Sequence, residues 1–158
     1  MLVQVGIALG SNLGDRYSEL NAGIAYLKTL SVINEVRESS RINTAPIDCP
    51  PGSGEFLNSV AEIDIDSEKL PPRLLLEKLQ DFERSRGRAS IRDVNAPRPL
   101  DLDIIYYGDQ VVREPFLIIP HPRAHVRRFV LDPLSRLRPE LILSGQTKTV
   151  SELLKLQE

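Results

Sequence analysis

The chain has 158 residues, of which 41% are hydrophobic and 27% charged, a composition typical of one globular domain with a full core. Its net charge of -2 argues against nucleic acid as the main partner. Cys49 is the single cysteine, which excludes an intrachain disulfide and a cysteine-based zinc site. The apolar runs are too short to span a membrane and no signal-peptide pattern opens the chain, so we expect a cytoplasmic protein without a membrane partner.

The first elements are a strand, a helix and a second strand. Residues 3–9 form an apolar run that predicts the first strand. A tight turn follows at residues 10–14, and Asp15 is placed to cap a helix. Hydrophobic residues recur there at helical spacing and predict a buried stripe, formed by Tyr17, Leu20, Ile24 and Leu27. Residues 32–42 predict a second strand, and the residues that follow, rich in proline, glycine and small polar side chains, predict a loop to residue 55.

A third strand and a second helix follow this loop. Residues 56–65 predict a third strand. Two prolines at the first helical positions then begin a long helix, which ends at Gly87. Its predicted buried stripe consists of side chains at spacings of three and four, namely Leu75, Leu79 and Phe82.

The remainder of the chain completes an α+β pattern. Residues 88–98 predict a basic loop, and residues 100–107 predict a fourth strand that a Gly-Asp turn connects to residues 110–112. Residues 126–137 show a mixed pattern, and a capping box at Thr149 and Glu152 predicts a short last helix. Because strands alternate with two long helices, we predict a single domain over residues 1–158 with a ferredoxin-like α/β sandwich, in which helices flank a mainly antiparallel sheet.

Asp101 and Asp103 are the most informative pair of residues in the chain. In a strand they project from the same face, and burying two like charges is costly unless a cation compensates them. Mg²⁺ takes such oxygen ligands, and eleven of the 15 arginines, whose guanidiniums match phosphate oxygens, fall between Arg84 and Arg138. The pair therefore indicates a site for a metal-bound polyphosphate. An isolated Asp-x-Asp is more often a solvated strand end or a structural partner of arginine.

Several motifs extend this pattern over nearly the whole chain. They are Ala-Leu-Gly-Ser-Asn-Leu-Gly-Asp at residues 8–15, Phe-Leu-Asn at 56–58, Gly-Arg at 87–88, Pro-Arg-Pro-Leu-Asp-Leu-Asp-Ile-Ile at 97–105, Ile-Pro-His-Pro at 119–122 and Arg-Arg-Phe-Val-Leu-Asp-Pro-Leu at 127–134. In this order they resemble the 6-hydroxymethyl-7,8-dihydropterin pyrophosphokinase family of folate biosynthesis. The resemblance implies a diphosphokinase that transfers pyrophosphate from ATP to the hydroxymethyl group of the pterin and releases AMP.

The resemblance also implies roles for individual residues. A pair of Mg²⁺ ions that bridge the ATP phosphates would be held by Asp101 and Asp103, and the transferring phosphate would be contacted by two catalytic arginines, Arg88 and Arg98. The family's ATP contacts fall on Gln80, Glu83, Ile104, His121 and Arg127. Its pterin contacts fall on Thr44, Ala45, Ile47, Phe56, Asn58 and Phe129, of which the two phenylalanines form an aromatic sandwich. We expect a monomer that binds ATP and 6-hydroxymethyl-7,8-dihydropterin.

Two other classes of protein stay open on the residues alone. A metal-dependent nucleotidyltransferase or nuclease would also use paired aspartates, although it should lack the set of Phe56, Asn58 and Phe129. Either phenylalanine taken singly would more often be a core residue. A ferredoxin-like RNA-binding module needs stacking aromatics and a basic surface, whereas 5% of the residues are aromatic. Departures from the family at Phe116, Ile118 and Pro122 bear on ATP binding more than on reaction type.

Overall fold

A five-stranded antiparallel sheet organises the fold. The computed structural model describes residues 1–45, 54–87 and 99–157. In spatial order the sheet consists of β2 (Arg37–Glu38), β4 (Phe56–Asp66), β1 (Leu2–Ser11) and β5 (Asp101–Tyr107), with β3 (Ile42–Thr44) also paired with β4. With one long helix between β1 and β2 and another between β4 and β5, this order is the ferredoxin-like one. The predicted α+β sandwich is therefore confirmed.

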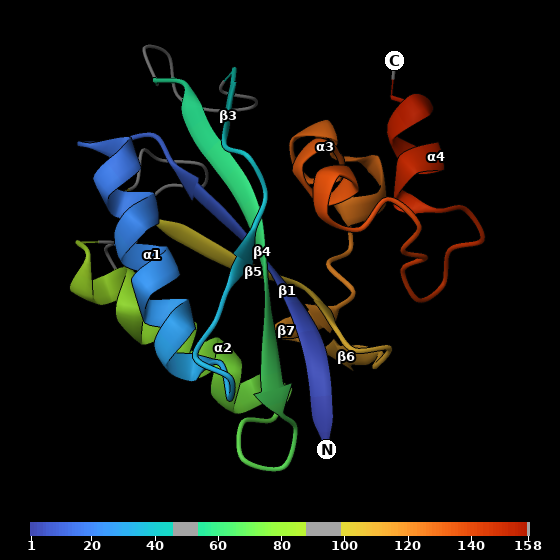
Figure 1. Ribbon diagram of the computed structural model, residues 1–158, viewed down its shortest axis with the longest axis horizontal. Coiled ribbons are helices and arrows are strands. Elements are labelled where there is room, and N and C mark those ends of the chain that lie inside the picture. Colours follow the sequence, from blue (N-terminus) through green and yellow to red (C-terminus); the bar gives the residue numbers. More distant parts are fainter. Residues whose placement is uncertain (46–53, 88–98, 158) are drawn as a thin grey trace.

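Helices lie on both faces of the sheet (Figure 1). The two long ones pack on one face and are α1 (Arg16–Leu30) and α2 (Pro72–Ser85). The rings of Tyr26 and Phe82 stack between them with centroids 4.2 Å apart. The C-terminal part of the chain supplies a hairpin and the helices of the other face, and comprises β6 (Val112–Glu114), β7 (Leu117–Ile119), the 3-10 helix η1 (Ala124–Val126), α3 (Arg128–Leu137) and α4 (Val150–Lys155). None of the helices in the described residues is long and apolar enough to cross a membrane.

The central strand β1 has a bulky face and a bare face. Its large side chains point into the core under α1 and α2 and are fully or almost fully buried, namely Val5, Ile7 and Leu9. The alternate positions carry residues with little or no side chain, namely Gly6, Ala8 and Gly10. The ring of Tyr106 lies against Gly6, where an added Cβ would stand 2.2 Å from its Cε1 atom. The bare face thus leaves room for groups that come from elsewhere in the chain.

A β-bulge in the pairing of β5 with β1 divides the residues of β5 between the two faces. The register shifts between Gly6 and Ile7, so that Ile105 has no direct partner across the ladder. Two successive residues, Ile105 and Tyr106, therefore join the core under α3, whereas Leu102 and Ile104 join the core under α1 and α2.

A buried carboxylate fastens the end of α3 to the sheet. Glu62 of β4 is 2% exposed and accepts hydrogen bonds from Arg37 at 3.0 Å, from Arg138 at 2.6 Å and from the hydroxyl of Tyr106. Burial and the bond to Glu62 raise the pKa of Tyr106, so the phenol stays protonated and donates. Arg138 also donates to Gln4 at 3.0 Å. Because a buried charge is tolerated only when it is fully partnered, this network fixes where α3 ends.

Two sequence predictions of local structure were wrong. Residues 32–42 do not form one strand, because a turn with Asn34 at a φ of 54° begins the segment and its neighbours Val32 and Ile33 are exposed. Within the predicted strand only β2 and the first residue of β3 are in a strand. Tyr17 is 55% exposed and does not belong to the buried stripe of α1, where Gly23 packs against Leu9 of β1.

The predicted helix ends were right. The Asp15 side chain accepts the backbone N–H of Ser18 at 3.1 Å, as an N-cap does. Gly87 follows the last turn of α2 with a φ of 104°, which favours glycine. Thr149 and Glu152 form both bonds of the capping box, at 3.1 Å and 2.9 Å.

The bare face of β1 makes a stability prediction. Gly6→Ala should lower the free energy of unfolding by about 1–3 kcal/mol, because its Cβ would overlap the buried ring of Tyr106. Gly54→Ala is the control, since its Cβ would meet its nearest neighbour at an ordinary 3.5 Å and should change stability by less than about 1 kcal/mol. Urea denaturation measures both. Equal stability of the two variants would show that Tyr106 can move aside.

Candidate functional site

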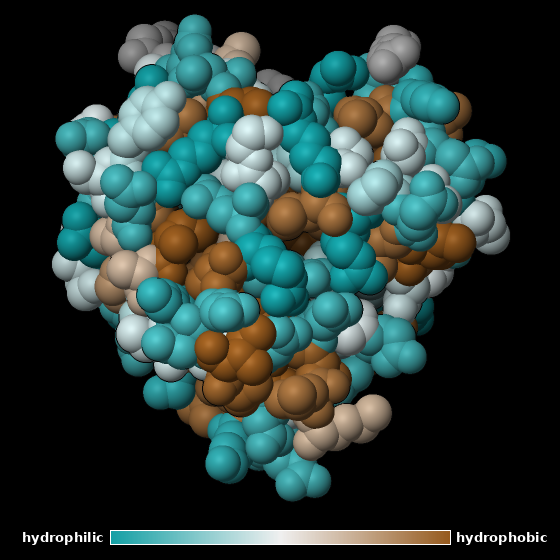
Figure 2. Space-filling model, in the orientation of Figure 1, coloured by the Kyte–Doolittle hydropathy of each residue, from teal (hydrophilic) through white to brown (hydrophobic). Residues whose placement is uncertain are grey.

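A cavity of about 640 Å³ lies between the bare face of the sheet and α3. This volume is in the range of small-molecule sites. Figure 2 shows the outline of the molecule notched between the end of β3 and the pair α3 and α4. Nine of the residues that the sequence predicted for the site line the cavity: Thr44, Ala45, Phe56, Asn58, Asp101, Asp103, His121, Arg127 and Phe129. Tertiary structure thus brings together positions from β3, β4, β5 and α3.

The absence of bulk on β1 makes the cavity possible. Ala8 and Gly10 both line it. A Cβ on Gly10 would stand 3.0 Å from Oδ1 of Asn58 and 3.6 Å from Cδ1 of Phe56. Glycine therefore lets both side chains approach β1. The sequence interpretation treated Gly10 only as the start of a turn, although the alternation of small residues at positions 6, 8 and 10 was visible.

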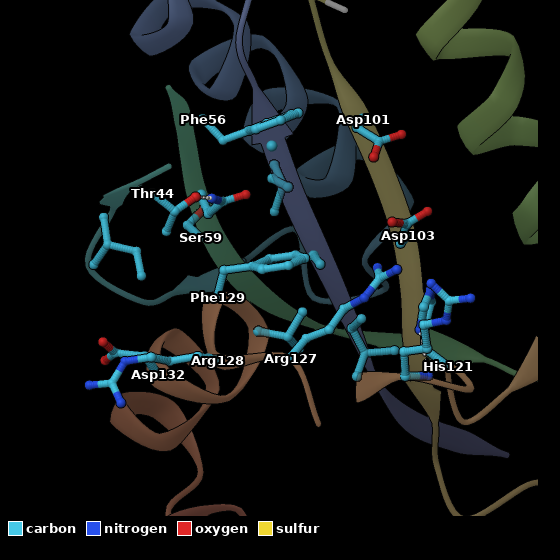
Figure 3. A pocket seen from close by; sticks show the side chains of 18 of the residues that line it. Thr44, Phe56, Ser59, Asp101, Asp103, His121, Arg127, Arg128, Phe129 and Asp132 are labelled. Atoms are coloured by element: carbon cyan, nitrogen blue, oxygen red, sulfur yellow. Dashed lines mark hydrogen bonds between the residues drawn. The ribbon is translucent and has the colours of Figure 1, made fainter. Parts of the chain in front are cut away.

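Two phenylalanine rings lie on opposite sides of the cavity (Figure 3). Phe56 belongs to β4, and Phe129 lies in the first turn of α3 with the guanidinium of Arg127 5.4 Å from its ring centroid. Between them Asn58 donates from Nδ2 to the hydroxyl of Thr44 at 2.6 Å. The bond fixes the amide of Asn58 with Oδ1 as its remaining acceptor. This arrangement is suited to a flat ligand with polar groups on its edge.

Asp101 and Asp103 form an acidic side of the same cavity. Both are half-buried and lie on the face of β5 opposite to the buried Leu102 and Ile104, as the period of a strand predicts. Figure 3 shows them along β5, with His121 and Arg127 below Asp103. Acidic and basic groups thus share one side, separated from the position of Thr44 by the space between the rings.

His121 is held as a neutral hydrogen-bond donor. Its backbone N–H donates to the carbonyl of Ile105 at 2.9 Å, which places the residue beside β5. Its Nδ1 atom accepts the backbone N–H of Arg123 at 3.2 Å. Burial lowers the pKa of His121 to about 4, and the charge of Arg127 adds to this effect. The imidazole is therefore neutral near pH 7 with its proton on Nε2.

Three predicted residues lie away from the cavity. Gln80 is exposed on α2, and the side chain of Ile104 is buried in the core on the other face of the sheet. Glu83 is buried on α2, where its carboxylate accepts a backbone N–H of β5.

Other predictions fall outside the described residues and concern Ile47, Cys49, Arg88, Arg98 and the loop at residues 88–98. Sequence reasoning missed other polar residues that line the cavity, among them Ser59, Arg123, Arg128 and Asp132.

The donor set of the cavity fits a metal ion that arrives with a phosphate ligand. Within the described ranges there is no group of three or more acidic, histidine or cysteine side chains that could hold a metal by itself. Asp101 and Asp103 supply two carboxylates on one face. Mg²⁺ is commonly bound by one or two carboxylates together with substrate phosphates and water, and the residues present match that pattern.

Comparison with known proteins agrees with these features. Residues 6–139 match the family described as 7,8-dihydro-6-hydroxymethylpterin-pyrophosphokinase (HPPK). The chain belongs to this family. A Haemophilus influenzae 2-amino-4-hydroxy-6-hydroxymethyldihydropteridine pyrophosphokinase is 34% identical over 154 residues, which cover 98% of this chain and 92% of the relative. A Bacillus subtilis pyrophosphokinase of the same name is 38% identical and covers 83% of this chain and 75% of its own.

Sequences similar to this chain also occur within longer proteins. A Pisum sativum protein named folate synthesis bifunctional protein, mitochondrial, is 41% identical over 135 residues, which are 83% of this chain and 24% of that protein. The family match runs from residue 6, within β1, to residue 139 and includes all of the residues that line the cavity except Gln157. Apart from that residue, the cavity is therefore built from the part of the chain that carries the family likeness.

The state of His121 can be tested by NMR titration. The chain has two histidines, so His125→Gln leaves one imidazole to observe. Its midpoint should lie near pH 4 in the free protein and rise when an ATP analogue binds, because the phosphates stabilise the imidazolium. Since the unfolded chain protonates near pH 6.5 and the native one near 4, this residue should make stability fall as the pH drops between these values. A midpoint near 6.5 in the free protein would contradict the assignment.

Proposed function

We propose that the chain transfers a pyrophosphoryl group from ATP to the hydroxymethyl group of 6-hydroxymethyl-7,8-dihydropterin and releases AMP, as a step of tetrahydrofolate biosynthesis. Membership of the pyrophosphokinase family supports the reaction class. The structural observation that carries the proposal is the presence, in one cavity, of an aromatic pair beside two carboxylates. A pterin and a metal-bound polyphosphate need these two features at reacting distance.

The aromatic part of the cavity fits the pterin. The bicyclic ring would stack between Phe56 and Phe129, and its N–H groups would donate to Oδ1 of Asn58. Thr44 and Ala45 border the same space and would contact the edge of the ring, together with Ile47 from outside the described residues. The pterin would thus present its hydroxymethyl group toward the acidic side.

The acidic and basic side fits the phosphates of ATP. Asp101 and Asp103 would hold a pair of Mg²⁺ ions, which would neutralise phosphate charge when bound. His121 would donate from Nε2 to a phosphate oxygen, and Arg127 would add a charged contact. The pterin hydroxyl oxygen would then bond to the β-phosphorus as the bond from that phosphorus to the AMP oxygen breaks. Such transfers need positioning and charge neutralisation more than a covalent nucleophile.

Four further residues keep roles that rest on the resemblance alone, namely Arg88, Arg98, Gln80 and Ile104. Arg88 and Arg98 would stabilise the charge on the transferring group, as arginines do in phosphoryl transfer. Gln80 and the backbone of Ile104 would contact the nucleotide. A nuclease or nucleotidyltransferase would use the acidic pair equally well, but neither would need the space between the rings of Phe56 and Phe129.

The decisive experiment is an assay of AMP release. Purified protein with ATP, Mg²⁺ and 6-hydroxymethyl-7,8-dihydropterin should form AMP and the pterin diphosphate in equal amounts. Omission of the pterin should abolish AMP formation. Pterin-independent release of AMP, or transfer of a single phosphate with ADP as the product, would contradict the proposal.

The acidic pair makes a first prediction. Asp101→Asn and Asp103→Asn should each abolish measurable turnover, because the amide keeps the shape but not the charge that holds the cation. The fold should survive, since removing one of two like charges relieves repulsion. Circular dichroism and thermal unfolding check the fold, and AMP release checks turnover. Near-wild-type AMP release by either variant would remove the metal assignment.

The aromatic pair makes a second prediction. Phe56→Ala and Phe129→Ala should each weaken pterin binding by about 1–3 kcal/mol, in line with the worth of base–aromatic stacking, with little change in the binding of ATP. Tyr17→Ala removes an exposed aromatic side chain outside the cavity and should leave pterin affinity unchanged. Calorimetric titration gives all of these affinities. Loss of ATP affinity instead of pterin affinity would assign the rings to the nucleotide or to the core.

A further inference from the structure

The buried stripe of α2 ends in a charged residue. Leu75 and Leu79 are fully buried, and the next position at the same spacing is Glu83, which is 5% exposed. A hydrophobic residue would complete an amphipathic helix here. A carboxylate at such a position is costly unless it is hydrogen-bonded, so its contacts indicate what it does.

The carboxylate of Glu83 contacts the backbone between the two aspartates. Its Oε2 atom accepts the N–H of Leu102 at 2.7 Å. Leu102 lies between Asp101 and Asp103, and β5 is the last strand in the sheet order, paired within the described part of the chain with β1 alone. Glu83 therefore satisfies a backbone donor of β5 that the sheet ladder does not serve.

We propose that Glu83 is a positioning residue that holds β5 so that Asp101 and Asp103 both face the cavity. Asp101 and Asp103 lie on either side of Leu102, whose N–H donates to Glu83. A rotation of β5 at Leu102 would therefore move both aspartates. The proposal rests on the proposed function in that it takes the two aspartates to hold the metal. It is distinct from the nucleotide contact that the resemblance implies for Glu83, because it acts through the backbone of Leu102.

The end of α2, which carries Glu83, is itself fixed to the rest of the fold. One turn of chain beyond it, Arg86 donates to Glu19 of α1 at 2.8 Å and 3.1 Å. Glu19 is 8% exposed, so the end of α2 is tied to α1 by a half-buried ion pair. Leu75 and Leu79 anchor the same helix in the core. A hydrogen bond from a helix held in this way can fix the orientation of a strand at the edge of a sheet. Mutation of residues that hold metal ligands in place typically lowers metal affinity about 10–100-fold.

Two variants distinguish whether Glu83 acts as a hydrogen-bond acceptor or through its negative charge. Glu83→Gln keeps an oxygen that accepts the N–H of Leu102, whereas Glu83→Ala removes it. The control is Glu77→Ala on the same helix, whose side chain is 57% exposed and pairs only loosely with Arg73. Two readouts need no turnover: amide hydrogen exchange at Leu102 in the metal-free protein, and binding of Mn²⁺ in the presence of a non-hydrolysable ATP analogue.

The proposal expects a specific pattern. Glu83→Ala should speed exchange at Leu102 by about tenfold or more and weaken Mn²⁺ binding by about 10–100-fold, while Glu83→Gln and Glu77→Ala stay within about threefold of the wild type. A purely structural role would lower the unfolding temperature of Glu83→Ala and leave the Mn²⁺ affinity of the folded protein unchanged, which would overturn the proposal.

Other outcomes also decide the matter. Loss of Mn²⁺ binding in Glu83→Gln equal to that in Glu83→Ala would show that the charge acts and not the acceptor, and would overturn it. If Glu83→Ala does not fold, wild-type exchange and Mn²⁺ affinity in Glu83→Gln would support the proposal and their loss would overturn it. Failure of the wild type to release AMP with the pterin would remove the proposed function, while the exchange at Leu102 would still report the hydrogen bond.

Discussion

The near absence of side chains on one face of β1 is the constraint on which the rest of the structure depends. The strand places Val5, Ile7 and Leu9 in the core under α1 and α2, while its other face carries only glycine and alanine from position 6 to position 10. A strand with large residues on both faces would fill the space that the cavity occupies. The same backbone thus anchors one face of the sheet and leaves the other open for a ligand.

The open face is occupied in two different ways along its length. At one end Tyr106 packs on Gly6 and joins the network of Glu62, Arg37 and Arg138 that holds the end of α3. At the other end Ala8 and Gly10 border the cavity, and the beginning of α3 carries Phe129 into it. One short helix therefore connects a buried electrostatic network to the proposed pterin site, and the bulge in β5 makes this possible by turning Tyr106 toward α3.

Electrostatic balance distinguishes the proposed phosphate side from the rest of the cavity. Acidic side chains at Asp101 and Asp103 attract cations, whereas Arg127 and the donor-bearing His121 attract phosphate oxygens. A metal-bound polyphosphate carries both kinds of charge and can satisfy both kinds of group at once. The lowered pKa of His121 follows from this setting, since burial beside cations disfavours another positive charge.

Much of the fold and of the site follows from local rules in the sequence. The strand period places Asp101 and Asp103 on one face, and the helix caps at Asp15, Gly87 and Thr149 follow from side-chain and backbone geometry within a few residues. These rules hold because each involves contacts of short range along the chain. The order of the motifs likewise indicated the family.

Only the tertiary structure decided which residues meet. Phe56 and Phe129 face one another across a cavity although they are far apart in the chain. A run that reads as one strand at residues 32–42 begins with a turn, and only the short strands β2 and β3 form after it. Glu83 has the spacing of a core residue, and only the position of β5 shows that it accepts the N–H of Leu102. Burial and hydrogen-bond partners of this kind depend on elements that pack from distant parts of the sequence, so no local pattern specifies them.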